Sequence, residues 1–144
     1  MADMRTINRK KTRVVDLAKV GASFDFLGYR FRFDLDLRGR GHRYLNPEPS
    51  KKSLQREREK LRDMTNASMV FKPVPQLIAE LNAHLNGWAA YFDWGYPRVA
   101  KREINRFVRQ RLACHLGRRS QRRYRPPAGT SLYGHLSDLG LVYL

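Results

Sequence analysis

Alternating apolar and polar residues predict a β-hairpin over about 23–46 of this 144-residue chain. The apolar positions are even-numbered up to Phe26 and odd-numbered from Tyr29 onward, so the pattern changes face at Gly28. A change of face within one strand requires an extra residue, which predicts a β-bulge at Gly28. A turn rich in glycine and arginine, at 38–41, then separates this long strand from a short returning strand.

Three later segments have apolar residues at helical spacing and predict a three-helix bundle. They cover about 51–64, 75–92 and 97–117. Ser50 is a suitable N-cap for the first helix, and Pro75 and Pro97 suit the starts of the other two. Gly87 lies inside the second helix, where glycine is about 1 kcal/mol less favourable than alanine, and this predicts that another element approaches closely there.

The predicted fold class is α+β, mainly α, with an N-terminal β-hairpin followed by a three-helix bundle. The C-terminal segment 132–141 is apolar enough to dock on the bundle, as a short fourth helix. Prolines at 47 and 49 interrupt the pattern between the hairpin and the first helix. We therefore expect two parts, one at 1–48 and one at 49–144.

Positive charge is concentrated in blocks along the chain. The sequence has 29 Lys and Arg against 13 Asp and Glu, a formal net charge of +16. Residues 98–125 alone contain eleven basic residues and one acidic residue. A small domain of this charge favours a polyanionic partner, and arginine is well suited to bind phosphate. The pattern predicts a nucleic-acid-binding protein.

The predicted phosphate-binding residues come from the first helix, the outer side of the third helix and the basic loop after it. They are Lys51, Lys52, Arg56, Arg98, Lys101, Arg102, Arg106, Arg109, Arg118, Arg119, Arg122, Arg123 and Arg125, with Tyr124 as a stacking residue. The alternative interpretation is a solvated basic surface with no ligand. If about five phosphates are contacted, the affinity should fall with salt with a log–log slope of about −4.

The sequence has no recognisable catalytic, metal or cofactor motif. Cys114 is the single cysteine, which excludes an internal disulfide, and the four histidines are scattered without the spacing of zinc ligands. No phosphate-binding glycine loop and no nucleophile elbow occurs. We expect no catalytic residue, no metal and no cofactor. With no apolar signal segment or membrane span, we expect a soluble cytoplasmic protein without membrane contact.

Several short motifs resemble, in order, the C-terminal part of reverse transcriptases and maturases encoded by group II introns. The segment 24–31 is similar to the primer-grip hairpin that ends the palm, with Phe26, Leu27, Gly28 and Tyr29 as primer-grip-like residues. The segments 49–53 and 118–122 resemble the opening and the end of the thumb, which is also called domain X or the maturase-specific domain. The run at 81–92 resembles its most recognisable motif, L-N-x-x-L-x-G-W-x-x-Y-F.

The resemblance implies a maturase-type module that binds structured group II intron RNA and assists its folding and splicing. The Tyr-x-Asp-Asp centre of the family's polymerase is absent from the sequence, so no polymerase activity is implied and the RNA itself would do the chemistry. On this interpretation 1–48 is a palm remnant with the primer-grip-like hairpin, and 49–144 is the thumb-like maturase-specific domain.

Two alternatives remain open. The chain could supply the thumb and primer grip to a reverse transcriptase completed by another chain, or it could be a general nucleic-acid chaperone without a dedicated target. DNA is a further candidate ligand. The apolar face of the hairpin would lack its usual cover, and this favours a homodimer through the hairpin.

Overall fold

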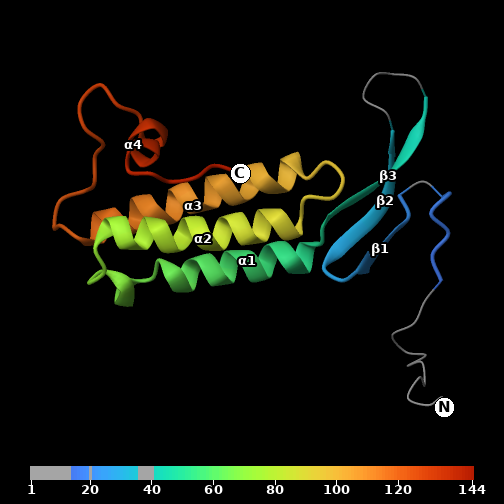
Figure 1. The fold of residues 1–144 in the computed structure, drawn as a ribbon, viewed down its shortest axis with the longest axis horizontal. Helices are drawn as coiled ribbons and strands as arrows, with labels where there is room; N and C mark the ends of the chain where they lie inside the picture. Colours follow the sequence, from blue (N-terminus) through green and yellow to red (C-terminus); the bar gives the residue numbers. More distant parts are fainter. Residues whose placement is uncertain (1–13, 20, 36–40) are drawn as a thin grey trace, which may run out of the picture.

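A small antiparallel sheet stands at one end of a bundle of three long helices (Figure 1). The computed structural model describes residues 14–19, 21–35 and 41–144. Its elements are β1 (Ser23–Phe26), β2 (Tyr29–Leu35), β3 (Arg43–Pro49), α1 (Lys51–Met64), the 3₁₀ helix η2 (Ala67–Met69), α2 (Val74–Tyr91), α3 (Arg98–Arg118) and α4 (Leu132–Asp138). The predicted α+β fold, mainly helical with an N-terminal β part, is confirmed.

The predicted bulge at Gly28 is wrong, because the chain makes a tight turn there. Phe26 pairs with Tyr29, so Leu27 and Gly28 alone connect β1 to β2. Both have positive φ, 52° for Leu27 and 85° for Gly28. This is the backbone of a type I′ turn, which suits the right-handed twist of a two-residue hairpin. The single long strand of the prediction is therefore two strands, and most of the turn predicted at 38–41 lies outside the described residues.

The third strand is longer than predicted and continues through both prolines. Phe31 pairs with Pro47, and Tyr29 pairs with Pro49. The strand order β1-β2-β3 places β3 at an edge of the sheet. Proline lacks an N–H, and an edge strand tolerates it because no further strand pairs with its outer side. The sheet therefore extends to Pro49, and α1 follows after a single residue.

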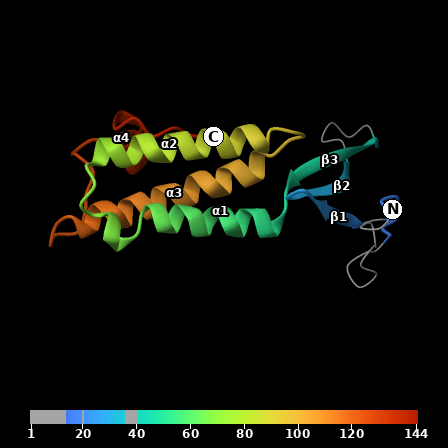
Figure 2. The ribbon, with the colours of Figure 1, turned by 60° about the horizontal axis from the view of Figure 1, so that its bottom comes forward.

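The three long helices lie side by side, with α1 and α3 running in the same direction and α2 returning between them along the chain (Figure 2). Their starts agree closely with the prediction. Ser50 caps α1, since its side-chain oxygen accepts a hydrogen bond from the Ser53 N–H at 3.1 Å. Val74 and Pro75 form the first turn of α2, and Pro97 precedes α3, which ends at Arg118, one residue beyond the predicted stop at Gly117.

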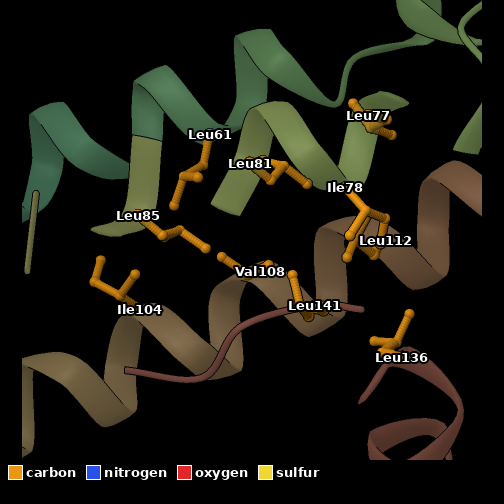
Figure 3. Close-up of a cluster of buried hydrophobic side chains, with 10 residues drawn as sticks. All are labelled: Leu61, Leu77, Ile78, Leu81, Leu85, Ile104, Val108, Leu112, Leu136 and Leu141. Carbon is orange, nitrogen blue, oxygen red and sulfur yellow. The ribbon is translucent and has the colours of Figure 1, made fainter. Parts of the chain in front are cut away.

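The core contains aliphatic side chains from all four α-helices and the tail (Figure 3). They are Leu61, Leu77, Ile78, Leu81, Leu85, Ile104, Val108, Leu112, Leu136 and Leu141. Asn82 holds the tail through both of its amide atoms, donating to the Gly140 carbonyl at 2.7 Å and accepting from the Val142 N–H at 2.9 Å. The predicted docking of the C-terminal segment is confirmed.

The close approach of another element that the sequence predicts at Gly87 is not found. A Cβ built there would meet no atom within 4 Å, and the residue is exposed, so no element packs closely against it. The apolar stripe of α2 is continuous without it, because Leu85 and Trp88 on either side carry the packing.

The sheet is joined to the bundle by buried contacts. The Tyr29 ring is buried, with its centroid 4.9 Å from that of Phe92, and its hydroxyl donates to the Tyr91 carbonyl. The turn between β1 and β2 is held as well, because the Ser53 hydroxyl donates to the Gly28 carbonyl at 2.7 Å and the Tyr91 hydroxyl donates to the Leu27 carbonyl at 2.7 Å. The apolar face of the hairpin is thus partly covered by α2.

The connection between α2 and α3 wraps around the edge of β3. The Asn46 side chain accepts a hydrogen bond from the Tyr96 N–H at 3.1 Å and donates to Asp34 at 2.7 Å. Gly95, with φ 70°, lies directly against the backbone of Pro47. This contact covers part of an edge that would otherwise be open to pairing. No helix within the described residues combines the length and the apolar character needed to cross a membrane.

Candidate nucleic-acid interface

Four arginines form a stripe along the outer side of α3, three of them exposed and the last, Arg109, half-buried. Arg98, Arg102, Arg106 and Arg109 are spaced by four, four and three residues, which places them on one face of the helix. Among the residues that the structure describes, no carboxylate lies within ion-pairing distance of these guanidinium groups. Lys101 is out of step with the stripe, and its Nζ lies 3.3 Å from Asp93 Oδ1. The stripe therefore presents three exposed cations to solvent, with the half-buried Arg109 at its end.

The basic residues of α1 divide between two sides of the helix. Arg58 and Arg62 face α3, since Arg58 Nη2 lies 3.0 Å from Glu103 Oε2 and the Arg62 Cζ lies 5.3 Å from the centroid of Phe107. Arg56 instead faces α2. Lys51 and Lys52 are exposed at the start of the helix. The predicted set from α1 is thus not a single surface.

Two hollows lie along the line where α1 meets α3. The first, here called the proximal hollow, is next to the sheet. Its charged lining residues are Arg30, Arg32, Lys51, Arg58, Glu48 and Glu103. Within it Arg32 Nη1 lies 3.4 Å from Glu48 Oε1, so cations and carboxylates partly neutralise each other. A mixed hollow of this kind attracts phosphate less than an all-cationic one.

The second, here called the distal hollow, has no carboxylate among its lining residues. It is lined by Arg62, Arg106, Phe107, Arg109, Gln110, Arg111, Ala113, Cys114 and Leu132. Four arginines from two helices therefore line one surface depression. Arginine offers planar, forked donors that match phosphate oxygens, and no carboxylate in the lining competes for them.

Five cations of these hollows are missing from the predicted set: Arg30, Arg32, Arg58, Arg62 and Arg111. Arg30 and Arg32 alternate along the polar face of β2, a signal that the sequence carried. Arg62 and Arg111 lie on different helices, and only the packing of α1 against α3 brings them together. A pattern along a single helix does not contain that information.

Two predicted residues brace the connection between α1 and α2. Arg118 donates to the Thr65 carbonyl at 3.3 Å, and Arg119 donates to the carbonyls of Val70 and Lys72 at 3.1 and 2.7 Å. These carbonyls follow the end of α1, where the helix leaves acceptors unsatisfied. Arg118 and Arg119 therefore have a structural role, whatever else they bind.

The basic loop that follows α3 presents its arginines to solvent and its tyrosine to the protein. Arg122, Arg123 and Arg125 are exposed. The Tyr124 ring stacks on His135, with centroids 5.9 Å apart and planes at 29°, and burial raises the pKa of its hydroxyl. One face of the ring is consequently occupied by the protein itself.

A third hollow separates α1 from α2 beside the β1–β2 turn. Leu27, Gly28, Arg56, Lys60 and Trp88 are among its lining residues, so the primer-grip-like turn and Arg56 meet there. At its floor a buried carboxylate, that of Glu57, lies 2.9 Å from the His84 Nε2. Burial raises the pKa of Glu57, and the His84 hydrogen bond opposes that rise.

His115 is fully buried at the far end of α3, among arginines of the same helix. Within the described residues neither ring nitrogen has a hydrogen-bond partner. Burial lowers the pKa of His115 from its ordinary value of 6.5, and the charges of Arg119, Arg118 and Arg111 lower it further, against an opposite effect of the Thr65 backbone. The imidazole is therefore neutral in the folded protein near neutral pH.

This burial predicts a loss of stability in mild acid. Below about pH 6.5 the unfolded chain binds a proton at His115 that the folded chain does not, so the free energy of unfolding falls as the pH drops toward the folded pKa. Thermal unfolding at pH 7 and pH 5 should show a smaller decrease in melting temperature for His115→Leu than for the unchanged protein. The matched control is His42→Gln, at an exposed histidine, which should keep the full decrease. An identical pH response of His115→Leu and the unchanged protein would contradict the assignment.

The described residues hold no group of three or more His, Cys, Asp or Glu side chains arranged to bind a metal ion. In comparisons with known proteins, the family model described as "Group II intron, maturase-specific domain" matches residues 54–129, just over half of the chain. This match begins inside α1 and includes the whole of α2 and α3, every arginine of the distal hollow and the basic loop. No curated protein matches the chain.

Proposed function

The chain belongs to the group II intron maturase-specific domain family, and from this membership we propose that it binds structured group II intron RNA and assists its folding and splicing. The family match extends over the maturase-specific domain alone, and no polymerase domain is detected with it. In this proposal the chain carries out no reaction, and the RNA supplies the catalysis.

The observation that carries the proposal is the cationic surface on the matched segment. The α3 stripe and every arginine of the distal hollow lie within residues 54–129, and among the described residues no carboxylate lines that hollow. Folded RNA repels itself wherever its helices pack, and cations placed at such contacts relieve the repulsion. A rigid bundle can supply them without any acid or base group.

The proposed contact residues are those of the α3 stripe, the start of α1 and the basic loop. Arg98, Arg102, Arg106 and Arg109 would contact phosphates along one groove, and the exposed loop arginines would reach a neighbouring strand. Arg118 and Arg119 would contact phosphates through those guanidinium N–H groups that are not bonded to backbone carbonyls. All phosphate-binding residues predicted from the sequence remain part of the proposal, and Arg62 and Arg111 are added to them.

A second candidate function follows from the β1–β2 turn. Phe26 and Leu27 at its tip are 60% and 69% exposed. An exposed apolar tip beside α1 and α2 is the arrangement expected if 1–48 is a palm remnant that completes a polymerase made from another chain. The same exposed residues, with Phe33, offer a surface for a homodimer.

The proposal is tested by comparing RNA ligands at one fixed salt concentration. We expect at least about tenfold tighter binding to a folded group II intron RNA than to a random-sequence RNA duplex of equal length, and faster splicing of that intron at limiting Mg²⁺. A DNA duplex of the same length shows whether DNA is bound as well.

Equal affinity for all three ligands, with no effect on splicing, would contradict the proposal and favour a general nucleic-acid chaperone. If splicing is unchanged but the chain restores primer extension to a thumbless reverse transcriptase, the second candidate function is favoured instead.

A further inference from the structure

The distal hollow contains a cation–aromatic pair in addition to its charge, and a second such pair lies at its edge. The Arg62 guanidinium lies over the Phe107 ring, with Cζ 5.3 Å from the ring centroid. At the neighbouring edge Arg109 lies over Tyr133, with Cζ 5.7 Å from that centroid. The Tyr133 ring is itself stacked on Tyr143 at 4.2 Å and 17°. Phe107 is partly buried against the core, so the first pair rests on a fixed support.

A guanidinium over a ring has its second face and its in-plane N–H groups left for a ligand. The second face can stack on a nucleobase, and the N–H groups can donate to phosphate oxygens. Arg111 adds a fixed wall, because its Nε and Nη2 donate to Thr65 at 3.1 and 3.3 Å and hold its side chain in place. Arg106 is exposed at the rim, where a flanking phosphate would lie.

We propose that the distal hollow binds an unpaired nucleotide of the RNA, with its base stacked on the Arg62–Phe107 pair and its flanking phosphates held by Arg106 and Arg109. This inference rests on the proposed function and assigns the part of the RNA that this site recognises. The bases of a duplex are stacked on one another and hidden from such a surface, whereas a bulged or looped nucleotide can enter it. An acidic peptide could pair with the arginines but would leave the stacking faces unused.

The first test separates stacking from charge. Arg62→Lys keeps the positive charge but removes the planar group, so affinity for an unpaired RNA of about ten nucleotides should fall about tenfold, while affinity for an RNA duplex should change less than about twofold. The matched control is Arg58→Lys, one turn earlier on the same helix and paired with Glu103 outside the distal hollow. It should bind both RNAs as the unchanged protein does.

The second test uses Cys114, the single cysteine of the sequence, which is exposed and lines the distal hollow. Its rate of alkylation by a maleimide should fall at least about fivefold when the unpaired oligonucleotide is saturating, because a base in the hollow blocks access to the thiol. The same oligonucleotide made without bases should protect much less.

The outcomes distinguish this inference from the function on which it rests. If the intron RNA binds but Arg62→Lys has no effect on the unpaired RNA, or Cys114 stays fully reactive when that RNA is bound, the nucleotide site is wrong and the proposed function stands. If an RNA duplex protects Cys114 as well as the unpaired RNA does, the hollow binds duplex RNA rather than an unpaired nucleotide, and the inference fails. If neither the intron RNA nor the oligonucleotide binds, the proposed function itself fails.

Discussion

Gly95→Ala is expected to lower the free energy of unfolding by about 3 kcal/mol, because a side chain at this position has no room. A Cβ there would lie 2.5 Å from the Pro47 carbonyl oxygen and 2.7 Å from Asn46 Oδ1. The first of these is backbone and cannot rotate away. With φ 70°, the residue also has a left-handed conformation that alanine adopts at a further cost. The connection between α2 and α3 would have to leave the edge of β3, and urea unfolding measures the loss.

Gly129→Ala separates the two causes. Gly129 has φ 78°, close to that of Gly95, but a Cβ there meets no atom within 4 Å. It should therefore cost only about 1 kcal/mol, the part due to the backbone conformation. Equal losses in the two variants would mean that the close approach to Pro47 is relaxed at little cost, and that the sheet is not fixed to the bundle through this loop.

The helices could be predicted because their signals are local. Ser50 needs only its neighbour Ser53 to cap α1, and Pro97 marks the start of α3 by its own chemistry. The apolar stripes that fill the core follow helical spacing within single segments. Each of these signals acts within one or two turns of chain, so the sequence is sufficient to place them.

The sheet was predicted less well because its geometry depends on partners. A change of apolar face fits a bulge or a two-residue turn equally, and Leu27 is not a residue that marks a type I′ turn. The prolines of β3 are acceptable only because that strand is an edge, which no local pattern reveals. Among the described glycines, Gly95 leaves the least room for a side chain, yet the sequence indicated a close approach at Gly87 instead.

The candidate interface also combines features that a local pattern predicts with features that only the packing of the helices produces. The excess of charge in 98–125 predicts a cationic face on α3, because a stripe on one helix is a local pattern. The distal hollow needs Arg62 from α1 beside Arg111 from α3, which is a result of packing. Packing also gives Arg118 and Arg119 their carbonyl partners, and composition alone could not distinguish these braced cations from the exposed ones.

Neutralising the α3 stripe should weaken RNA binding on the order of a few hundredfold at about 0.1 M salt. Arg102→Gln, Arg106→Gln and Arg109→Gln together remove three cations, and each phosphate contact contributes about 0.9 to the salt exponent, or about eightfold in affinity at this salt concentration. The slope of log affinity against log salt should become shallower by about 3. The bundle should stay folded, since glutamine is nearly as good a helix former as arginine and the three side chains point away from the core.

A control of equal charge tests whether position matters as well as charge. Lys19→Gln, Arg43→Gln and Lys60→Gln also remove three exposed cations, but none of them belongs to α3. Because phosphate contacts act over short distances in salt, this triple variant should lose less than about fivefold in affinity and keep the original slope. Fluorescence anisotropy with a labelled intron fragment, measured from about 0.05 to 0.3 M salt, gives both quantities. If the two triple variants lose affinity equally, the chain attracts RNA through its total charge, and the face on α3 has no special role.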